Sequence, residues 1–282
     1  MSFRDLALAA LTYPDATPDI ALRTGVAIAR RIGGQLTLIS LRVKVPALHN
    51  PVANAMLGLD KAAGQATHLS DAAAHHEASS AAIAAEECGV KLVAHAITSD
   101  LEDVDDNLAR AARTHDLCLL AVGAAAPAAR DAAEAVLFGA GRPVMIFPDN
   151  IEWTPSERFG TVVVAWDGSA RAARAVADAM PLLSAARQVR ILAVTGEKPQ
   201  VEAGVTAPLL RHLAAHGVAA EVDEVAIGGR KIGEVIRHHV VGHGVELVVM
   251  GGFGHARFRE FVLGGATQSL LEAPPCAVMM SH

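Results

Sequence analysis

Four glycines near the C-terminus have a spacing that could hold a phosphate chain. Gly251 and Gly254 stand three residues apart, and after nine further residues Gly264 and Gly265 precede a short helical pattern. Glycine lets a ligand approach the backbone closely, and the free amides at a helix N-terminus attract an anion. The stretch is neither a GxGxxG fingerprint nor a P-loop. Taken alone, a loop with several glycines is more often architectural, with glycines that cap helices or turn the chain, than phosphate-binding.

A carboxylate follows an apolar run upstream of this glycine loop. Thr161–Trp166 is β-branched and almost wholly apolar, which is typical of a strand covered on both faces. Asp167 comes next, and Ser169 is placed to cap a helix that begins at Ala170. Ligands of open α/β sheets bind beyond the carboxyl ends of the strands. At such an end, Asp167 could accept hydrogen bonds from a ribose or a base.

Other reactive residues give weaker signals. His212 and His216, and likewise His239 and His243, lie four residues apart, which places each pair on one face of a helix. No acidic residue or cysteine completes a zinc pattern beside them, so we interpret them as exposed or capping histidines and predict no metal site. A GxSxG nucleophile elbow is absent, which leaves hydrolysis by a catalytic triad unsupported.

Strands that alternate with helices must position these residues. This order predicts a parallel sheet with right-handed crossovers. The predicted strands are Val189–Thr195, Ala219–Ala226, Glu246–Met250 and Cys276–Met280, and the predicted helices are Ala170–Leu183, Ala207–His216, Ile232–Val241 and a short one after Gly265.

The same order of elements occurs twice in the chain. Asp116–Gly123 resembles Glu246–Gly251, and Arg142–Phe147 resembles the run after Pro275. A duplicated unit of this kind predicts two tandem domains. We therefore predict an α/β protein with two tandem doubly wound parallel-sheet domains, residues 1–149 and 150–282.

Two segments are predicted to lie outside the repeated elements. Pro148–Gly160 is rich in turn-forming residues and is expected to join the domains. Lys44–His68 makes the first domain longer, and we expect a loop there, followed by a helix over Ser70–Cys88.

Composition limits the class of protein. The chain has 282 residues, of which 52% are hydrophobic and 19% charged, with a net charge of -6. A globular fold is expected, and nucleic acid is not an expected partner because no excess of basic residues is present. The uncharged runs are shorter than the ~20 residues of a membrane span, so no membrane partner is expected. Three cysteines without a CxxC pair are typical of reduced thiols, which predicts a cytoplasmic location.

The second half resembles the universal stress protein family, whose nucleotide-binding members carry Gly-x2-Gly-x9-Gly-Ser/Thr at this point. Gly251, Gly254 and Gly264 match that spacing, and Asp167-Gly168-Ser169 matches the signature after the first strand. The whole chain is similar to a tandem member of the family. The resemblance implies that ATP or another adenine nucleotide binds in the second domain.

The resemblance also implies roles for individual residues. Asp167 and the backbone of Val194 would meet the adenosine, and His255 would either bond a phosphate or shape the turn. The residues implied around the phosphates are Gly251, Gly254, Gly264, Gly265 and Ala266. Gly265 departs from the pattern because it stands where the nucleotide binders have Ser or Thr; Thr267 could supply the hydroxyl if the helix start is displaced.

The first domain lacks the corresponding residues. It has Thr12-Tyr13-Pro14 in place of the Asp167 signature, and Ala124–Pro127 offers no second glycine. We expect a structural partner without nucleotide. The resemblance implies that Val144–Phe147 pairs with Cys276–Met280, which would make an intramolecular pseudo-dimer, and a homodimer is a further expectation.

Three classes of function follow. The first is a stress-response regulator that binds ATP or another adenine nucleotide in its second domain, with at most slow hydrolysis. The second is an interaction protein that acts through its paired domains and binds no nucleotide. The third is an enzyme of the related α/β superfamily that uses ATP for group transfer. No residue pattern identifies a catalytic base, so we expect a protein that is not primarily an enzyme.

Overall fold

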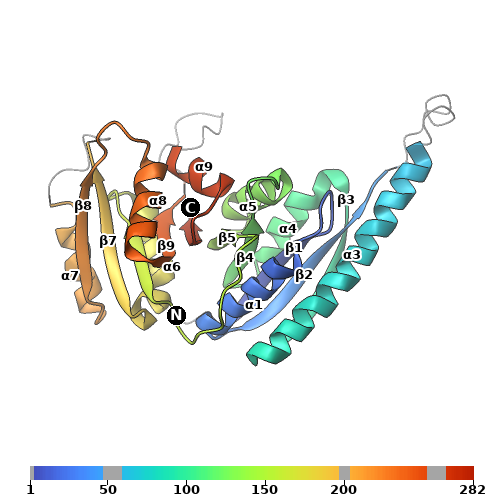
Figure 1. Ribbon diagram of the computed structural model, residues 1–282, viewed down its shortest axis with the longest axis horizontal. Coiled ribbons are helices and arrows are strands. Elements are labelled where there is room, and N and C mark those ends of the chain that lie inside the picture. Colours follow the sequence, from blue (N-terminus) through green and yellow to red (C-terminus); the bar gives the residue numbers. More distant parts are fainter. Residues whose placement is uncertain (1–2, 47–58, 197–203, 253–264) are drawn as a thin grey trace.

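The computed structural model describes residues 3–46, 59–196, 204–252 and 265–282. Within these residues, ten strands form one sheet with helices on both faces (Figure 1). The strand order is β3-β2-β1-β4-β5-β10-β9-β6-β7-β8, so each half of the chain contributes five neighbouring strands. All pairings inside each half are parallel. The predicted α/β fold with two doubly wound units is confirmed.

The strands have the following bounds. They are β1 (Asp5–Leu11), β2 (Gln35–Lys44), β3 (Leu92–Asp100), β4 (Leu117–Val122), β5 (Val144–Pro148), β6 (Thr161–Ala165), β7 (Gln188–Thr195), β8 (Ala220–Ala226), β9 (Val245–Gly251) and β10 (Ala277–Ser281). The helices are α1 (Asp19–Ile32), α3 (Leu59–Cys88), α4 (Val104–Ala112), α5 (Pro127–Gly139), α6 (Ala170–Ala185), α7 (Ala207–Ala215), α8 (Ile232–His243) and α9 (Gly265–Glu272), with a 3-10 turn η1 (Leu101–Asp103).

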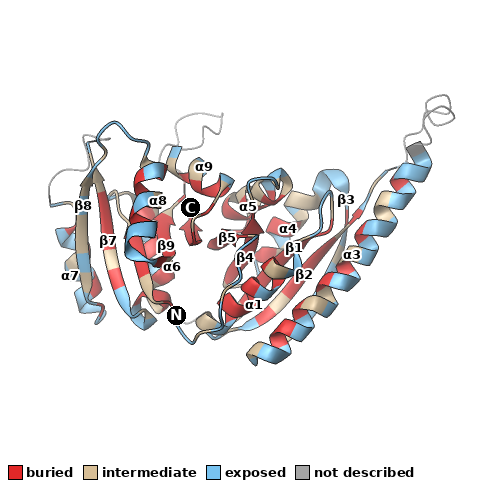
Figure 2. Ribbon diagram, viewed as in Figure 1, coloured by how far each residue is buried: buried red, intermediate tan, exposed pale blue. Residues whose placement is uncertain are grey.

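The helices divide between the two faces in the same way in both halves. One buried cluster contains residues of α1, α3, α6 and α7, namely Leu22, Ala81, Ala175 and Leu213. The other contains residues of α4, α5, α8 and α9, namely Leu108, Val136, Ile236 and Leu270. The central strands are therefore buried on both faces, as Figure 2 shows. This burial explains why their sequences are continuous apolar runs rather than alternating patterns.

The two halves meet at an antiparallel pair of strands. Val278 of β10 lies opposite Ile146 of β5, and both side chains are fully buried. The pairing of Val144–Phe147 with the last strand, expected from the resemblance, is present. Antiparallel pairing here means that the parallel strands of the two halves run in opposite directions where they meet.

A clamp on Arg31 holds the segment between the halves. Its guanidinium lies 2.8 Å from Glu246 Oε2 of β9 and donates to Thr154 O at 3.0 Å. The same group lies 4.7 Å from the ring centroid of Trp153, within the range of a cation–π contact. Residues 149–160 contain no helix or strand, as the turn-forming residues predict. Hydrogen bonds from Thr24 and Arg31 nevertheless hold this segment against α1.

The long helix α3 corrects one expectation. The predicted helix over Ser70–Cys88 begins at Leu59, so the segment from Leu59 to His68, expected as loop, is helical. This stretch consists mainly of residues with good helix propensity. Residues 47–58, where the turn-forming residues concentrate, lie outside the described part of the chain.

None of the helices in the described part of the chain combines the length and the apolar character that crossing a membrane requires.

Candidate functional site

Three of the predicted site residues lie together at one edge of the sheet. Gly251 ends β9, Asp167 follows β6, and Val194 lies next to the last residue of β7. These three strands are neighbours and run parallel, so their carboxyl ends share one edge. Ligands of open parallel sheets bind at this kind of edge.

Asp167 is held in a tight turn between β6 and α6. Its Oδ1 accepts a hydrogen bond from Ser169 N at 3.0 Å. Between them Gly168 has φ of +74°, in the left-handed region that favours glycine. Ser169 Oγ then accepts from Ala172 N at 3.1 Å, which confirms the predicted N-cap of α6. The turn fixes the carboxylate at the sheet edge.

Gly251 allows the first turn of α6 to approach β9. A Cβ at Gly251 would lie 2.6 Å from Ala172 N and 2.7 Å from the carbonyl carbon of Arg171. Both are backbone atoms, so no side chain could be accommodated here without moving the helix. Gly251 therefore has an architectural role whether or not a ligand binds beside it. Its absent side chain brings the N-terminal turn of α6 to the same edge as Asp167.

The other predicted site residues that the structure describes lie at the start of α9. Gly265 is exposed, its φ is outside the left-handed region, and a Cβ there would meet no described atom within 4 Å. Ala266 is half-buried, whereas Thr267 is only 2% exposed and faces the interior. Buried in this way, Thr267 is a poor replacement for the missing hydroxyl. Gly254, His255 and Gly264 lie outside the described residues.

Contacts that the sequence analysis missed fix α9 against α8. A Cβ at Gly233 would overlap the Oγ of Ser269, so only glycine lets the two helices approach this closely. Arg237 donates hydrogen bonds to the carbonyls of Ser269 and Ala273. Gly233, in the first turn of α8, is the sequence feature from which this close packing could have been predicted. These contacts orient the N-terminus of α9.

The sheet register identifies equivalent positions in the two halves. Leu8 lies opposite Leu119 and Leu38, and Val162 lies opposite Leu247 and Val189. Since Leu119 and Leu247 each precede a strand-end glycine by four residues, Leu8 corresponds to Val162. Five residues further along each strand, Tyr13 corresponds to Asp167 and Val43 to Val194.

In the N-terminal half a side chain of α3 closes this edge. Val43 N donates to Ser70 Oγ at 2.7 Å, and Ser70 Oγ lies 2.5 Å from the hydroxyl of Thr12. Ser70 is 1% exposed. The backbone that would meet an adenosine in the other half is therefore occupied here by an internal hydrogen bond.

A small cavity remains beside this closed edge. Its volume is about 200 Å³, and its lining comes mainly from apolar residues after β1 and β4, with two carboxylates, Asp15 and Asp149. This is below the ~300–1,000 Å³ of ordinary ligand pockets. A Cβ at Gly123, the counterpart of Gly251, would overlap the carboxylate of Asp149. Negative charge at this place opposes a phosphate.

The two histidine pairs differ in burial and in their polar partners. His212 and His216 are exposed, as expected. His239 is instead buried at 5% exposure, and its Nε2 lies 2.9 Å from Asp223 Oδ2. The Arg190 guanidinium lowers the pKa of Asp223 to about 2, and burial lowers the pKa of His239. The interpretation of His239 as an exposed or capping histidine is wrong, because it is buried and β8 brings Asp223 beside it.

Comparisons with known proteins agree with this architecture. Residues 158–282 match the model of the universal stress protein family. Among curated protein sequences, none matches the chain. A universal stress protein from Archaeoglobus fulgidus DSM 4304 has a similar structure, with a TM-score of 0.70 at 16% identity over 99% of this chain and 97% of that one.

Two structures from Pseudomonas aeruginosa are also similar. A functionally unknown protein of strain PAO1 gives a TM-score of 0.55 at 14% identity, covering 99% of this chain and 92% of its own. A putative universal stress protein of strain UCBPP-PA14 gives 0.53 at 14% identity, covering 99% and 93%. Residues 158–282 thus match the universal stress protein family, and the whole chain shares its fold with these three structures.

Proposed function

We propose that this protein is a regulatory protein of the universal stress type that binds one molecule of ATP or another adenine nucleotide. The site lies in the C-terminal half, at the carboxyl ends of β9, β6 and β7. Asp167 and the backbone of Val194 bind the adenosine, and the glycines after β9 together with the start of α9 surround the phosphates.

One observation carries this proposal. Asp167, Val194 and Gly251 come from three separate segments, and they lie at the ends of adjacent parallel strands. The turn through Gly168 and the bond from Ser169 N hold the carboxylate there in advance of any ligand. A carboxylate at this edge is suited to the hydroxyls of a ribose.

The N-terminal half supports a stoichiometry of one. Its equivalent edge is closed by the Ser70 hydrogen bond, and Asp149 occupies the space beside Gly123. Tyr13 stands where the other half has Asp167. A nucleotide in this half would need to displace a buried hydrogen bond and to place its phosphates beside a carboxylate.

A second candidate function rests on a specific observation. The family's hydroxyl is replaced by Gly265, and the nearby Thr267 is buried. A protein with this site could act through its paired halves without nucleotide. Binding measurements separate the two candidates, because only the first predicts saturable binding of ATP.

Calorimetric titration of the full chain with ATP tests the proposal. We expect one site per chain. Asp167→Asn retains a side-chain oxygen for Ser169 N and removes the charge, so the turn is preserved while a charged hydrogen bond to the ligand is lost. Such a loss costs ~1.5–3 kcal/mol, which corresponds to about ten- to a hundredfold weaker binding.

Asp15→Asn provides the matched control, because Asp15 lies in the corresponding loop after β1 of the other half. We expect it to leave ATP affinity unchanged. Two sites of equal affinity would contradict the assignment to one half, and no saturable binding at millimolar ATP would favour the nucleotide-free function.

A further inference from the structure

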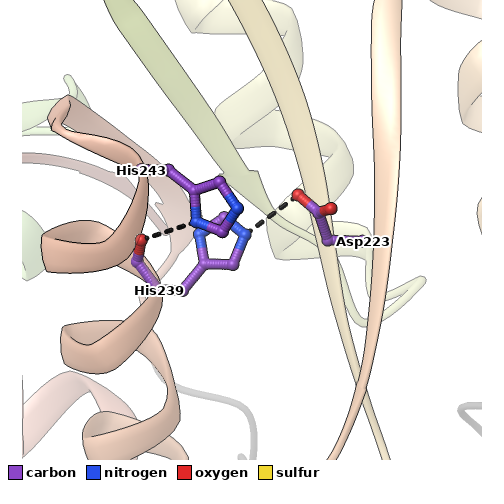
Figure 3. A group of neighbouring side chains, drawn as sticks. All are labelled: Asp223, His239 and His243. Carbon is purple, nitrogen blue, oxygen red and sulfur yellow. Dashed lines mark hydrogen bonds and ion pairs between the residues drawn. The ribbon is translucent and has the colours of Figure 1, made fainter.

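A second cluster of polar side chains lies on α8 and β8, on one face of the sheet. In the described part of the chain, Asp223, His239 and His243 each offer a ligand atom, and these atoms lie within 4.8 Å of one another. The two imidazole rings are stacked, with centroids 4.2 Å apart and an angle of 24° between their planes. Figure 3 shows a nitrogen of each ring turned toward Asp223.

Hydrogen bonds fix which nitrogen of His243 is available. Its Nδ1 lies 3.0 Å from the carbonyl oxygen of His239, which can only accept, so Nδ1 carries the proton. The neutral ring therefore has a lone pair on Nε2. Metal-binding histidines usually donate their other ring N–H to a carbonyl or a carboxylate in this way.

Asp223 is held in place by a separate partner. The Arg190 guanidinium contacts both carboxylate oxygens at 2.7 Å, and it also lies 2.5 Å from Glu221 Oε2. Each carboxylate oxygen can accept more than one hydrogen bond or metal contact. Two carboxylates against one guanidinium leave the immediate surroundings negative, which favours a cation.

The internal hydrogen bonds do not account for the whole cluster. The Nδ1 of His239 is buried and has no hydrogen-bond partner among the described residues. Buried polar atoms are normally paired. With Nδ1 unpaired, the contact of Nε2 with Asp223 is the one polar role of this buried ring among the described residues.

We propose that Asp223, His239 and His243 bind one divalent transition-metal ion, for which zinc is the expected occupant. Two imidazoles and a carboxylate are ligands that zinc prefers, whereas Mg²⁺ and Ca²⁺ prefer oxygen alone. The ion takes the position of the proton shared by His239 and Asp223, and this proton moves to His239 Nδ1. Three protein ligands leave a fourth position for water.

The geometry requires a small adjustment. Ligands on a tetrahedral ion with bonds of ~2.0 Å lie about 3.3 Å apart. His239 and Asp223 already lie 2.9 Å apart, so His243 makes the remaining movement. His243 is exposed, so its stacking on His239 and its hydrogen bond to the His239 carbonyl are the described contacts that limit this movement.

The test is a titration of the tag-free 282-residue chain after removal of metal by a chelator, with no nucleotide present. Zn²⁺ affinity is measured by calorimetry, and Co²⁺ absorption reports the coordination. We expect one ion per chain. His243→Gln keeps an amide N–H for the His239 carbonyl at an exposed position, and we expect at least ten- to a hundredfold weaker Zn²⁺ binding.

His216→Gln is the matched control, because His212 of α7 and its C-cap residue His216 have the same spacing and form no three-residue ligand group among the described residues. It should bind Zn²⁺ as the parent does. Asp223→Asn should weaken binding, which separates a three-ligand site from a two-histidine chelate. Zn²⁺ should also raise the melting temperature of the parent and not that of His243→Gln.

Three results would overturn the proposal. They are Zn²⁺ binding no tighter than millimolar, parent-like binding by His243→Gln or Asp223→Asn, and an equal loss in His216→Gln.

Discussion

The two halves have the same sheet order but differ where Val43 and Val194 stand. At the first of these equivalent positions, the amide of Val43 is bonded to Ser70, a side chain of the 30-residue helix α3. At the second, Val194 is half-buried beside the Asp167 turn. A repeated fold thus presents one edge that is closed by its own helix and one that carries a positioned carboxylate.

The difference shows that duplication of a fold does not duplicate a site. Closure depends on Ser70 of α3, a helix of 30 residues, whereas α7 on the same face of the other half has 9 residues. The sheet and its faces are unaffected by this difference. The difference between the two edges is set by a few side chains that the strand pattern leaves free to vary.

The largest expected effect concerns the strand pair that joins the two halves. Val278→Lys places a charge at a fully buried position opposite Ile146, so we expect more than about 4 kcal/mol of destabilisation, or separation of the halves. Denaturant unfolding and size-exclusion chromatography measure the result.

Val241→Lys is the control for this charge. Val241 is 80% exposed on α8, and surface substitutions usually change stability by less than about 0.5 kcal/mol. A Val278→Lys variant as stable as Val241→Lys would mean that the halves are stable independently of β5 and β10.

The second-largest expected effect concerns a buried carboxylate on α3, the helix that supplies Ser70. Glu77 lies two helical turns after Ser70 on α3, and burial raises its pKa from 4.5 to about 7. The folded protein therefore retains a proton that the unfolded chain releases above pH 4.5. Stability should fall as pH rises from about 4.5 to 7, by up to about 3 kcal/mol.

Glu77→Gln removes this titration. Denaturant unfolding between pH 5 and 8 should show a flatter profile for the variant, with greater stability than the parent above pH 7. Glu87→Gln, at an exposed position of the same helix, should follow the parent. A stability difference between the parent and Glu77→Gln that stays constant across this range would show that Glu77 is ionised in the folded protein.

The smallest expected effect concerns the opposite edge. Gly265→Ser restores the family's hydroxyl at a position where a Cβ meets no described atom and φ is ordinary. One added hydrogen bond to a phosphate should tighten ATP by roughly tenfold. Adenosine serves as the control ligand, because it has no phosphate to gain the contact. Equal changes for ATP and adenosine, or weaker ATP binding, would place the phosphates away from α9.

Local sequence patterns determined most of the architecture. Apolar β-branched runs predicted β6 to β10 within one or two residues, and Ser169 predicted the N-cap of α6. Such signals work because hydrophobic periodicity and capping depend on residues close together in the chain. The helix α3 was predicted too short because turn-forming residues upstream obscured a start that lies among ordinary helix formers.

The tertiary structure decided which side chains meet. Ser70 reaches Val43 from 27 residues away, and Asp223 reaches His239 across 16 residues and between two elements. Neither pair has a local sequence signature, because its distance is set by how a helix packs on a sheet. The sequence by itself determined the repeated α/β fold and the glycine and aspartate signals of one half. Only packing decided that the other edge is closed and that two histidines acquire a carboxylate, since these contacts depend on side-chain positions that no periodicity encodes.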